Sequence, residues 1–213
     1  MEIFLKGEEF VLYPERGMLW KQKKLLFIAD LHIGKATHFR KSGIQVPMKT
    51  EINNLKFLEK LLLKSRCDKV IFLGDMFHSS HNYICEKFIQ WRNNFPSIEM
   101  VLIEGNHDIL NESFYKDANL SVTDQLILNP FLFTHKPLEE IEYAGYYNIA
   151  GHIHPGVKLY GKGKQSLSLS CFYFGRLNGL MPSFGAFTGN CIVSPKENDE
   201  IYVIADNQIA RVS

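Results

Sequence analysis

The stretch LLFIADLH, residues 25–32, decides the fold class. Its apolar half has the length and composition of a buried strand, and it breaks at Asp30, which is followed two residues later by His32. Similar runs recur downstream as KVIFLGD, MVLIEGN and FLFTH, each ending in a polar residue. Because ligands bind beyond the carboxyl ends of the strands in an open α/β sheet, the pattern predicts an α/β protein with its site at that edge.

Helices are predicted between these strands. Apolar side chains recur at helical spacing through residues 48–65, behind Pro47, which indicates an amphipathic helix packed on the sheet. Residues 83–93 predict a second helix, after a serine pair that can cap it. The chain then returns to a strand at residues 100–104.

Both ends of the chain are predicted to be mostly β. The first thirty residues alternate apolar runs with a turn signal at residues 13–17, as in a hairpin that enters a sheet. Beyond Phe131 strand-like runs take over at residues 167–174, 185–188 and 201–204. No repeat or linker divides the chain, so we expect a single domain over residues 1–213.

Composition favours an intracellular enzyme. The first ten residues contain four charged residues, which leave no apolar core for a signal peptide, and no later stretch is a membrane span. We therefore expect a cytoplasmic protein. The net charge of +1 excludes the strong basic field of a general nucleic-acid coat protein. The cysteines lack the close pairing of a zinc knuckle or a disulfide scaffold, so we expect reduced, partly buried thiols at Cys67, Cys85, Cys171 and Cys191.

The polar residues at the strand ends form a two-metal ligand set. We expect one divalent ion to be bound by Asp30, His32 and His154. A second ion is assigned to Asn106, His135 and His152, with Asp75 bridging the two. Two carboxylates neutralise only half of the charge of two divalent ions, so the site would attract a phosphate. Imidazole and carboxylate ligands without thiolate suit manganese, our first expectation, or iron or zinc.

Each motif alone has a structural alternative. Asp30 could cap a following helix, residues 105–108 could form a polar turn, and His135 alone could be structural. The two histidines of Gly151-His152-Ile153-His154 are more specific, because side chains two apart point the same way in an extended segment. The occurrence of all these motifs in order, mostly at strand ends, favours the metal site.

The full set resembles the calcineurin-like metallophosphoesterase superfamily. The resemblance covers most of the chain and implies a two-sheet β sandwich flanked by helices, a four-layer αββα fold. It implies a hydrolase that uses a hydroxide between two metal ions. The motifs that carry it are Asp30-Leu31-His32, Gly74-Asp75-Met76-Phe77-His78, Gly105-Asn106-His107-Asp108, His135 and Gly151-His152-Ile153-His154.

Three stretches narrow the resemblance. ADLHIGKA at residues 29–36, FRKSGIQVP at residues 39–47 and PSFGAFTG at residues 182–189 are similar to the ligase-associated DNA damage response endonuclease PdeM family. This implies a manganese-dependent phosphodiesterase or endonuclease acting on DNA, with a DNA ligase or helicase as repair partner.

One departure weighs against a protein phosphatase. Many phosphoprotein phosphatases of the superfamily carry an aspartate three residues after the bridging aspartate, whereas this chain has His78. Gly-Asp-x-Phe-His is instead similar to the motif of double-strand-break repair nucleases, in which the matching histidine contacts substrate phosphate. The alternative is that His78 only packs or caps the next helix.

Two further groups of residues have expected roles in catalysis. His107 is the candidate general acid, and Asp108 would either orient it or cap the turn. Arg40 and His38, near Lys35, could bind flanking phosphates or form a solvated face.

Three functions therefore compete. The first is a DNA nuclease or phosphodiesterase, and the second hydrolyses a small nucleotide or other small phosphoester, which suits the near-neutral charge. The third, least favoured because every expected ligand is present, is a metal-holding interaction module without catalysis.

Overall fold

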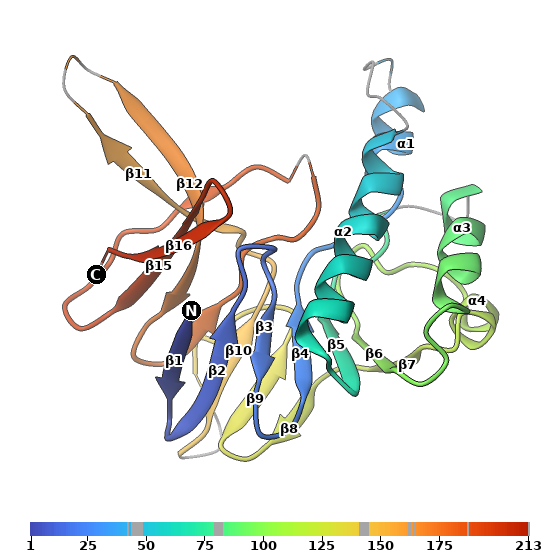
Figure 1. Cartoon of the computed structure of the whole chain (residues 1–213), viewed down its shortest axis with the longest axis horizontal. Coiled ribbons are helices and arrows are strands. Elements are labelled where there is room, and N and C mark those ends of the chain that lie inside the picture. The colour runs from blue at the N-terminus through green and yellow to red at the C-terminus, as the bar shows by residue number, and fades with distance from the viewer. Residues whose placement is uncertain are drawn as a thin grey trace.

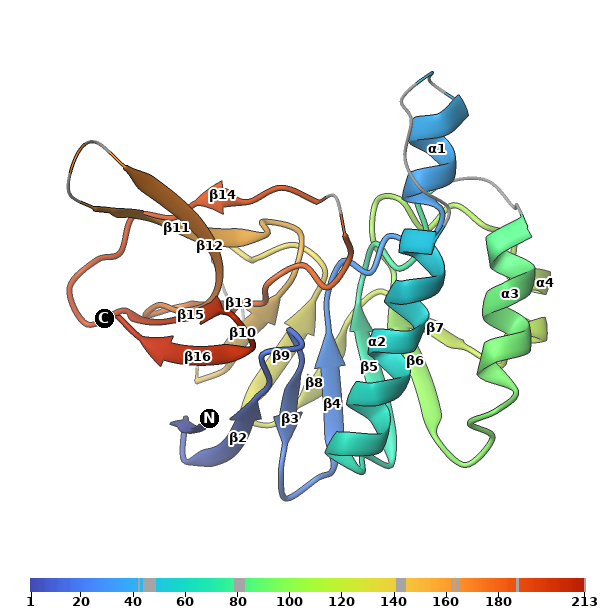
Figure 2. The ribbon, with the colours of Figure 1, turned by 45° about the horizontal axis from the view of Figure 1, so that its top comes forward.

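The computed structural model describes residues 1–41, 43, 49–78, 83–140, 145–161, 163, 165–186 and 188–212. Two mixed sheets face each other (Figures 1 and 2). In the first sheet β1 to β4 are antiparallel and β4 to β7 are parallel. Its strands, in spatial and chain order, are β1 (Glu2–Leu5), β2 (Glu8–Leu12), β3 (Met18–Trp20), β4 (Leu25–Ile28), β5 (Lys69–Leu73), β6 (Glu99–Ile103) and β7 (Ser121–Thr123).

The second sheet follows the order β14-β11-β12-β13-β10-β9-β8, and the β15–β16 pair joins it at β12. At its centre β9, β10 and β13 are parallel. Its strands are β8 (Leu126–Leu128), β9 (Phe131–Thr134), β10 (Tyr147–Ala150), β11 (Pro155–Tyr160), β12 (Ser166–Phe174), β13 (Asn178–Leu180), β14 (Cys191–Ile192), β15 (Glu200–Ala205) and β16 (Gln208–Arg211).

The helices are α1 (Lys35–Lys41), α2 (Lys49–Ser65), α3 (Tyr83–Arg92) and α4 (Glu112–Asp117). They lie on the side of the first sheet that faces away from the second (Figure 1). Strand alternation explains the two cores, because Leu26 and Ile28 pack toward the helices while Phe27 packs toward the second sheet. Between the sheets Phe27 stacks on Phe133 with ring centroids 4.3 Å apart.

These observations confirm the predicted two-sheet sandwich with helices. In the described part of the chain the helices cover one side only, and the outer face of the second sheet carries none. The helices predicted at residues 48–65 and 83–93 are α2 and α3. Pro47 and the capping serines lie outside the described residues. No helix of the described residues is long and apolar enough to cross a membrane.

One predicted strand is wrong. Residues 185–188 contain no strand in their described part, because their backbone is bound to the loop after β4. The Phe184 N–H donates to the Ala29 carbonyl and the Gly185 N–H donates to the Asp30 carbonyl. The short helices α1 and α4 were not predicted, since six or seven residues are too few to establish a helical period.

The cysteine prediction holds with one exception. All four cysteines are free thiols, and Cys67, Cys85 and Cys171 are buried. Cys191, in the edge strand β14, is exposed.

Candidate metal centre

The predicted ligands gather at one edge of the sandwich, because the parallel strands of both sheets end there. Asp30 and His32 follow β4, Asp75 follows β5 and Asn106 follows β6 in the first sheet. From the second sheet, His135 follows β9, and His152 and His154 follow β10. The edge predicted from strand ends is therefore the edge that the fold forms.

A first cluster consists of Asp30, His32 and His154. One ligand atom from each residue lies within 4.8 Å of the others. His154 Nε2 is 3.3 Å from Asp30 Oδ1. The Asp30 carboxylate also accepts the His152 backbone N–H at 2.9 Å, a contact to the loop after β10 rather than to α1.

A second cluster consists of Asp75, His135 and His152, again with ligand atoms within 4.8 Å of one another. His135 Nδ1–H donates to the Leu73 carbonyl at 2.9 Å, so Nε2 is the free ligand atom. That Nε2 lies 3.4 Å from Asp75 Oδ1 and 3.1 Å from His152 Nδ1.

Asp75, a member of the second cluster, also faces the first. Its Oδ2 is 3.9 Å from His32 Nε2 in the first cluster, whereas its Oδ1 faces His135 in the second. The two oxygens of one carboxylate thus point to different groups of ligands. This is the arrangement that a bridging ligand of two metal ions requires.

The donor atoms fit divalent cations. His32 Nε2 is buried and has no hydrogen-bond partner among the described residues, which is costly unless a cation binds it. Burial, followed by the nearby charge of Lys35, lowers the pKa of His32 to about 2, so its imidazole is in the neutral form that binds metal. Burial also lowers the pKa of His152. Two buried carboxylates, 1% and 3% exposed, supply the compensating negative charge at Asp30 and Asp75.

The backbone of the ligands is strained. Five of them have positive φ angles between 48° and 65°, a region that residues other than glycine rarely adopt. Such strain persists where the surrounding structure imposes it, and it concentrates at functional sites. The five residues are Asp30, His32, Asp75, His152 and His154.

Glycines allow the loops to approach each other closely. A Cβ on Gly105 would lie 2.2 Å from the Asp75 backbone nitrogen. Gly74 has a φ of +79°, and a Cβ there would lie 2.2 Å from His135 Nδ1. Any larger residue at either position would displace a ligand.

Asn106 lies at the open side of the second cluster. It is exposed, and it lines a cavity of about 410 Å³ together with His135 and Lys136. The position is compatible with the ligand role expected for its amide.

His107 and His78 form a pair of imidazoles beside the first cluster. Their ring centroids are 4.5 Å apart, and the His107 ring is 5.6 Å from that of His32. His78 Nδ1 lies 3.0 Å from His32 Nδ1. The His107 backbone N–H donates to Asp75 Oδ1 at 2.9 Å, which ties this exposed side chain to the proposed bridging carboxylate.

The Asp108 carboxylate makes the contacts expected of a turn cap. Its carboxylate accepts the backbone N–H groups of Phe77 and Gly105, each at 2.9 Å. Burial raises its pKa to about 7, although these two bonds oppose the shift. Asp108 thus joins the loops after β5 and β6, and we treat it as a positioning residue.

The residues expected to bind flanking phosphates lie on α1. The Arg40 guanidinium donates to Thr37 Oγ1 at 2.8 Å, and the side chain of His38 is outside the described part of the chain. Burial lowers the pKa of Lys35, while Asp75 and Asp30 oppose the shift. Lys35 is therefore linked electrostatically to the carboxylates of both clusters.

Arg16 and Ser183 support the Asp30 loop, although no sequence pattern predicted a role for either residue. The Arg16 guanidinium donates to the Ser183 carbonyl at 2.9 Å, and Ser183 Oγ donates to the Asp30 carbonyl at 2.9 Å. These two hydrogen bonds connect the turn that contains Arg16 to the Asp30 loop through Ser183. Ser183 belongs to the PSFGAFTG stretch, which marked the resemblance, but Arg16 lies in a turn that carries no functional pattern.

Known proteins resemble this chain in fold and in sequence. The chain is similar to the crystal structure of Pseudomonas putida nuclease MPE, at 27% identity and a TM-score of 0.84, over 100% of this chain and 99% of that one. It is also similar to Yfce, a phosphoesterase from E. coli, at 16% identity and a TM-score of 0.47, over 88% of this chain and 97% of that one. No curated protein sequence matches. Residues 23–183 match the calcineurin-like phosphoesterase family, and the chain belongs to that family.

Proposed function

We propose that this phosphoesterase is a manganese-dependent phosphodiesterase that cleaves DNA in the response to DNA damage. The observation that carries the proposal is the pair of clusters joined by Asp75, with the imidazoles of His107 and His78 beside them. Similarity over the whole chain to a protein described as a nuclease supports nucleic acid as the substrate.

Seven residues would bind the two metal ions that the proposed ester hydrolysis requires. Asp30, His32 and His154 would hold one ion, and Asn106, His135 and His152 the other, with Asp75 between them. When bound, the ions supply Lewis-acid polarisation of the phosphoryl group and a nucleophile of lowered pKa.

Hydrolysis also requires a proton at the departing ester oxygen. His107 is exposed beside the clusters, and its backbone N–H donates to Asp75 Oδ1, which anchors its main chain at the site. It is therefore placed to hold that proton and release it to the leaving alkoxide. His78, which lies against both His107 and His32, would contact a phosphate oxygen.

One observation favours a second candidate. A net charge of +1 suits a small phosphoester as well as a polymer, since a small substrate needs no extended basic surface. The predicted cytoplasmic location and repair partners stay predictions of the sequence.

Turnover of paired substrates tests the proposal. A chromogenic phosphodiester and the matching phosphomonoester would be given to one preparation with added manganese, and Asp75→Asn protein would report contaminating activity. We expect preference for the diester, no turnover by Asp75→Asn, and cleavage of defined DNA. Preference for the monoester would favour the second candidate, and no turnover of either substrate despite bound metal would favour the non-catalytic module.

A further inference from the structure

We propose that the β11–β12 hairpin is an arm that binds the nucleic-acid strand leading away from the metal centre. The inference rests on the proposed function, because it assigns a second contact to the same polymeric substrate. It concerns residues that have no part in metal binding.

The arm is joined directly to the metal centre. β11 begins at Pro155, immediately after His154 of the first cluster. At a rise of about 3.3 Å per residue, Lys158 lies roughly 13 Å along the strand from His154, and Tyr160 roughly 20 Å. Phosphates of one DNA strand in a duplex are about 3.4 Å apart along the axis, so the arm would reach phosphates several nucleotides from the cleaved one.

The outer half of the hairpin extends beyond the sheet (Figure 1, upper left). β14 pairs with β11 only at Pro155 and Gly156, and β15 pairs with β12 only from Cys171 onward. Between these limits no other strand of the described residues flanks the ribbon. An isolated two-stranded ribbon is marginally stable in water, so a partner that binds it would also order it.

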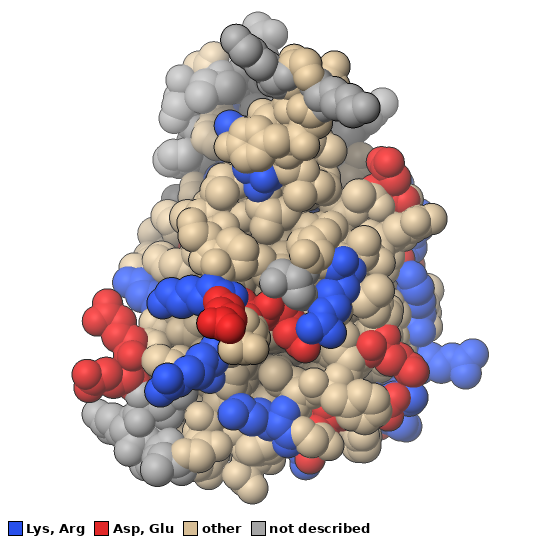
Figure 3. Space-filling model, turned by 90° about the vertical axis from the view of Figure 1, so that its left-hand side faces the viewer, with Lys and Arg blue, Asp and Glu red and all other residues tan. Residues whose placement is uncertain are grey.

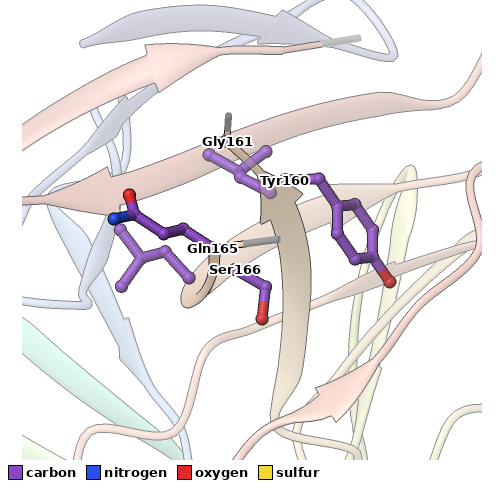
Figure 4. A pocket seen from close by; sticks show the side chains of 6 residues that line it. Tyr160, Gly161, Gln165 and Ser166 are labelled. Carbon is purple, nitrogen blue, oxygen red and sulfur yellow. The ribbon is translucent and has the colours of Figure 1, made fainter. Parts of the chain in front are cut away.

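One face of the ribbon is polar and exposed. The register places Lys158 opposite Ser168 and Tyr160 opposite Ser166, so these four side chains share a face. Tyr160 is 78% exposed, and Lys158 Nζ lies 5.7 Å from the centroid of its ring. Figure 4 shows Tyr160 and Ser166 near the tip of the hairpin, where they line a shallow, open hollow.

This chemistry fits a nucleic-acid strand. Lysine and serine hydroxyls are common donors to phosphate, and an exposed aromatic ring provides a stacking surface for a base. Residues 155–174 contain three lysines and no acidic residue, although the whole chain has a net charge of only +1. On the side where the hairpin projects, the lower half of the surface mixes charges of both signs, whereas the upper part carries few (Figure 3).

The opposite face of the ribbon is apolar and defines the competing partner. Leu159 and Leu167 are paired across the strands, 40% and 57% exposed. A second copy of this chain would be expected to bind there. The polar face, with its lysine and tyrosine, favours nucleic acid over this alternative.

The test compares substrates of different length. The double variant Lys158→Ala/Tyr160→Ala would be assayed on the chromogenic phosphodiester and on single-stranded DNA oligonucleotides of increasing length. Because stacking on one aromatic ring contributes measurably to binding, we expect kcat/KM to fall at least about fivefold for oligonucleotides longer than about six nucleotides. The dependence on salt should become weaker for the same oligonucleotides. Turnover of the chromogenic diester should stay unchanged.

Two further variants provide the controls. Lys23→Ala removes the same charge from the turn between β3 and β4, at the other end of the strands, and should leave every substrate unaffected. Leu159→Ser/Leu167→Ser changes only the apolar face, and sedimentation would report whether it alters the oligomeric state.

Unchanged kcat/KM of the Lys158→Ala/Tyr160→Ala variant on long oligonucleotides would contradict the proposal that the hairpin binds nucleic acid. An equal loss of kcat/KM in Lys23→Ala would also contradict it. So would a dimer that dissociates only in the leucine variant, if the lysine–tyrosine variant still cleaves oligonucleotides normally. If the wild-type protein cleaves the chromogenic diester but no oligonucleotide, the proposed function fails instead.

Discussion

Acidic residues at the two ends of the parallel strands β4, β5 and β6 differ in burial and in their partners. At their amino ends the acids are exposed and each has a lysine partner. Lys24 Nζ is 3.3 Å from Asp68 Oδ2, and Lys69 Nζ is 2.7 Å from Glu99 Oε1. At the carboxyl ends Asp30 and Asp75 are buried, and the groups within 4 Å of their carboxylates are imidazoles rather than lysines.

This difference separates a structural edge from a binding edge. Exposed ion pairs contribute little to stability, about 0–1 kcal/mol each, and they need nothing further. Buried carboxylates without a fixed cation are unfavourable unless a cation binds them. Metal ions bound to the two clusters would therefore complete the binding edge, whereas the opposite edge is complete by itself.

The largest effect is expected at Asp75. Asp75→Asn removes the charge that faces both clusters, so we expect turnover of a phosphodiester to fall by at least about a thousandfold, or about 4 kcal/mol of transition-state stabilisation. Steady-state kinetics with saturating manganese measures the loss. Activity within tenfold of wild type would contradict the bridging role.

His107→Asn should have the next largest effect. If His107 supplies the proton to the leaving group, kcat should fall at least about a hundredfold while metal content stays at the wild-type level. A chromogenic substrate with a good leaving group needs less help from an acid, so it should lose less activity than DNA does. Near wild-type kcat on DNA would remove His107 from the chemistry.

Asp108→Asn sharpens the distinction between catalysis and positioning. An asparagine can accept one of the two backbone N–H bonds with its oxygen but presents an amide donor to the other, so unfolding should become easier by about 1–3 kcal/mol. Chemical denaturation measures this change. A loss of kcat as large as that of His107→Asn, without loss of stability, would instead mean that Asp108 acts through the imidazole.

The smallest effect is expected at the amino ends. Glu99→Gln removes the ion pair with Lys69, and we expect a change in unfolding free energy below about 1 kcal/mol with unchanged kcat and KM. Thermal unfolding and phosphodiester turnover would be measured together. An activity loss comparable to that of the carboxyl-end variants would mean that the two edges are not independent.

The ligands at the binding edge could be predicted from the sequence, whereas the contacts that hold the ligand loops in place could not. Asp30, Asp75 and His135 could be placed because each ends an apolar run, and strand ends of parallel sheets converge. The strand predicted at residues 185–188 failed because its backbone bonds the Asp30 loop, a long-range contact that leaves no local pattern. Arg16 was missed for the same reason.

The role of Asp108 also depended on tertiary structure. Its sequence position beside His107 suits an orienting residue and a turn cap equally, and only the bonds from Phe77 and Gly105 separate them. The left-handed backbone of the ligands was likewise invisible in the sequence, since aspartate and histidine adopt it there under the constraint of neighbouring loops.

Metal stoichiometry tests the two-ion site most directly. Purified protein would be saturated with manganese, freed of excess ion and analysed for metal per chain, beside variants of each cluster, His32→Ala and His152→Ala. We predict two ions for the wild type and a loss confined mainly to one ion in each variant. Fewer than one ion per wild-type chain, or two ions retained in both variants, would contradict a binuclear site formed by these residues.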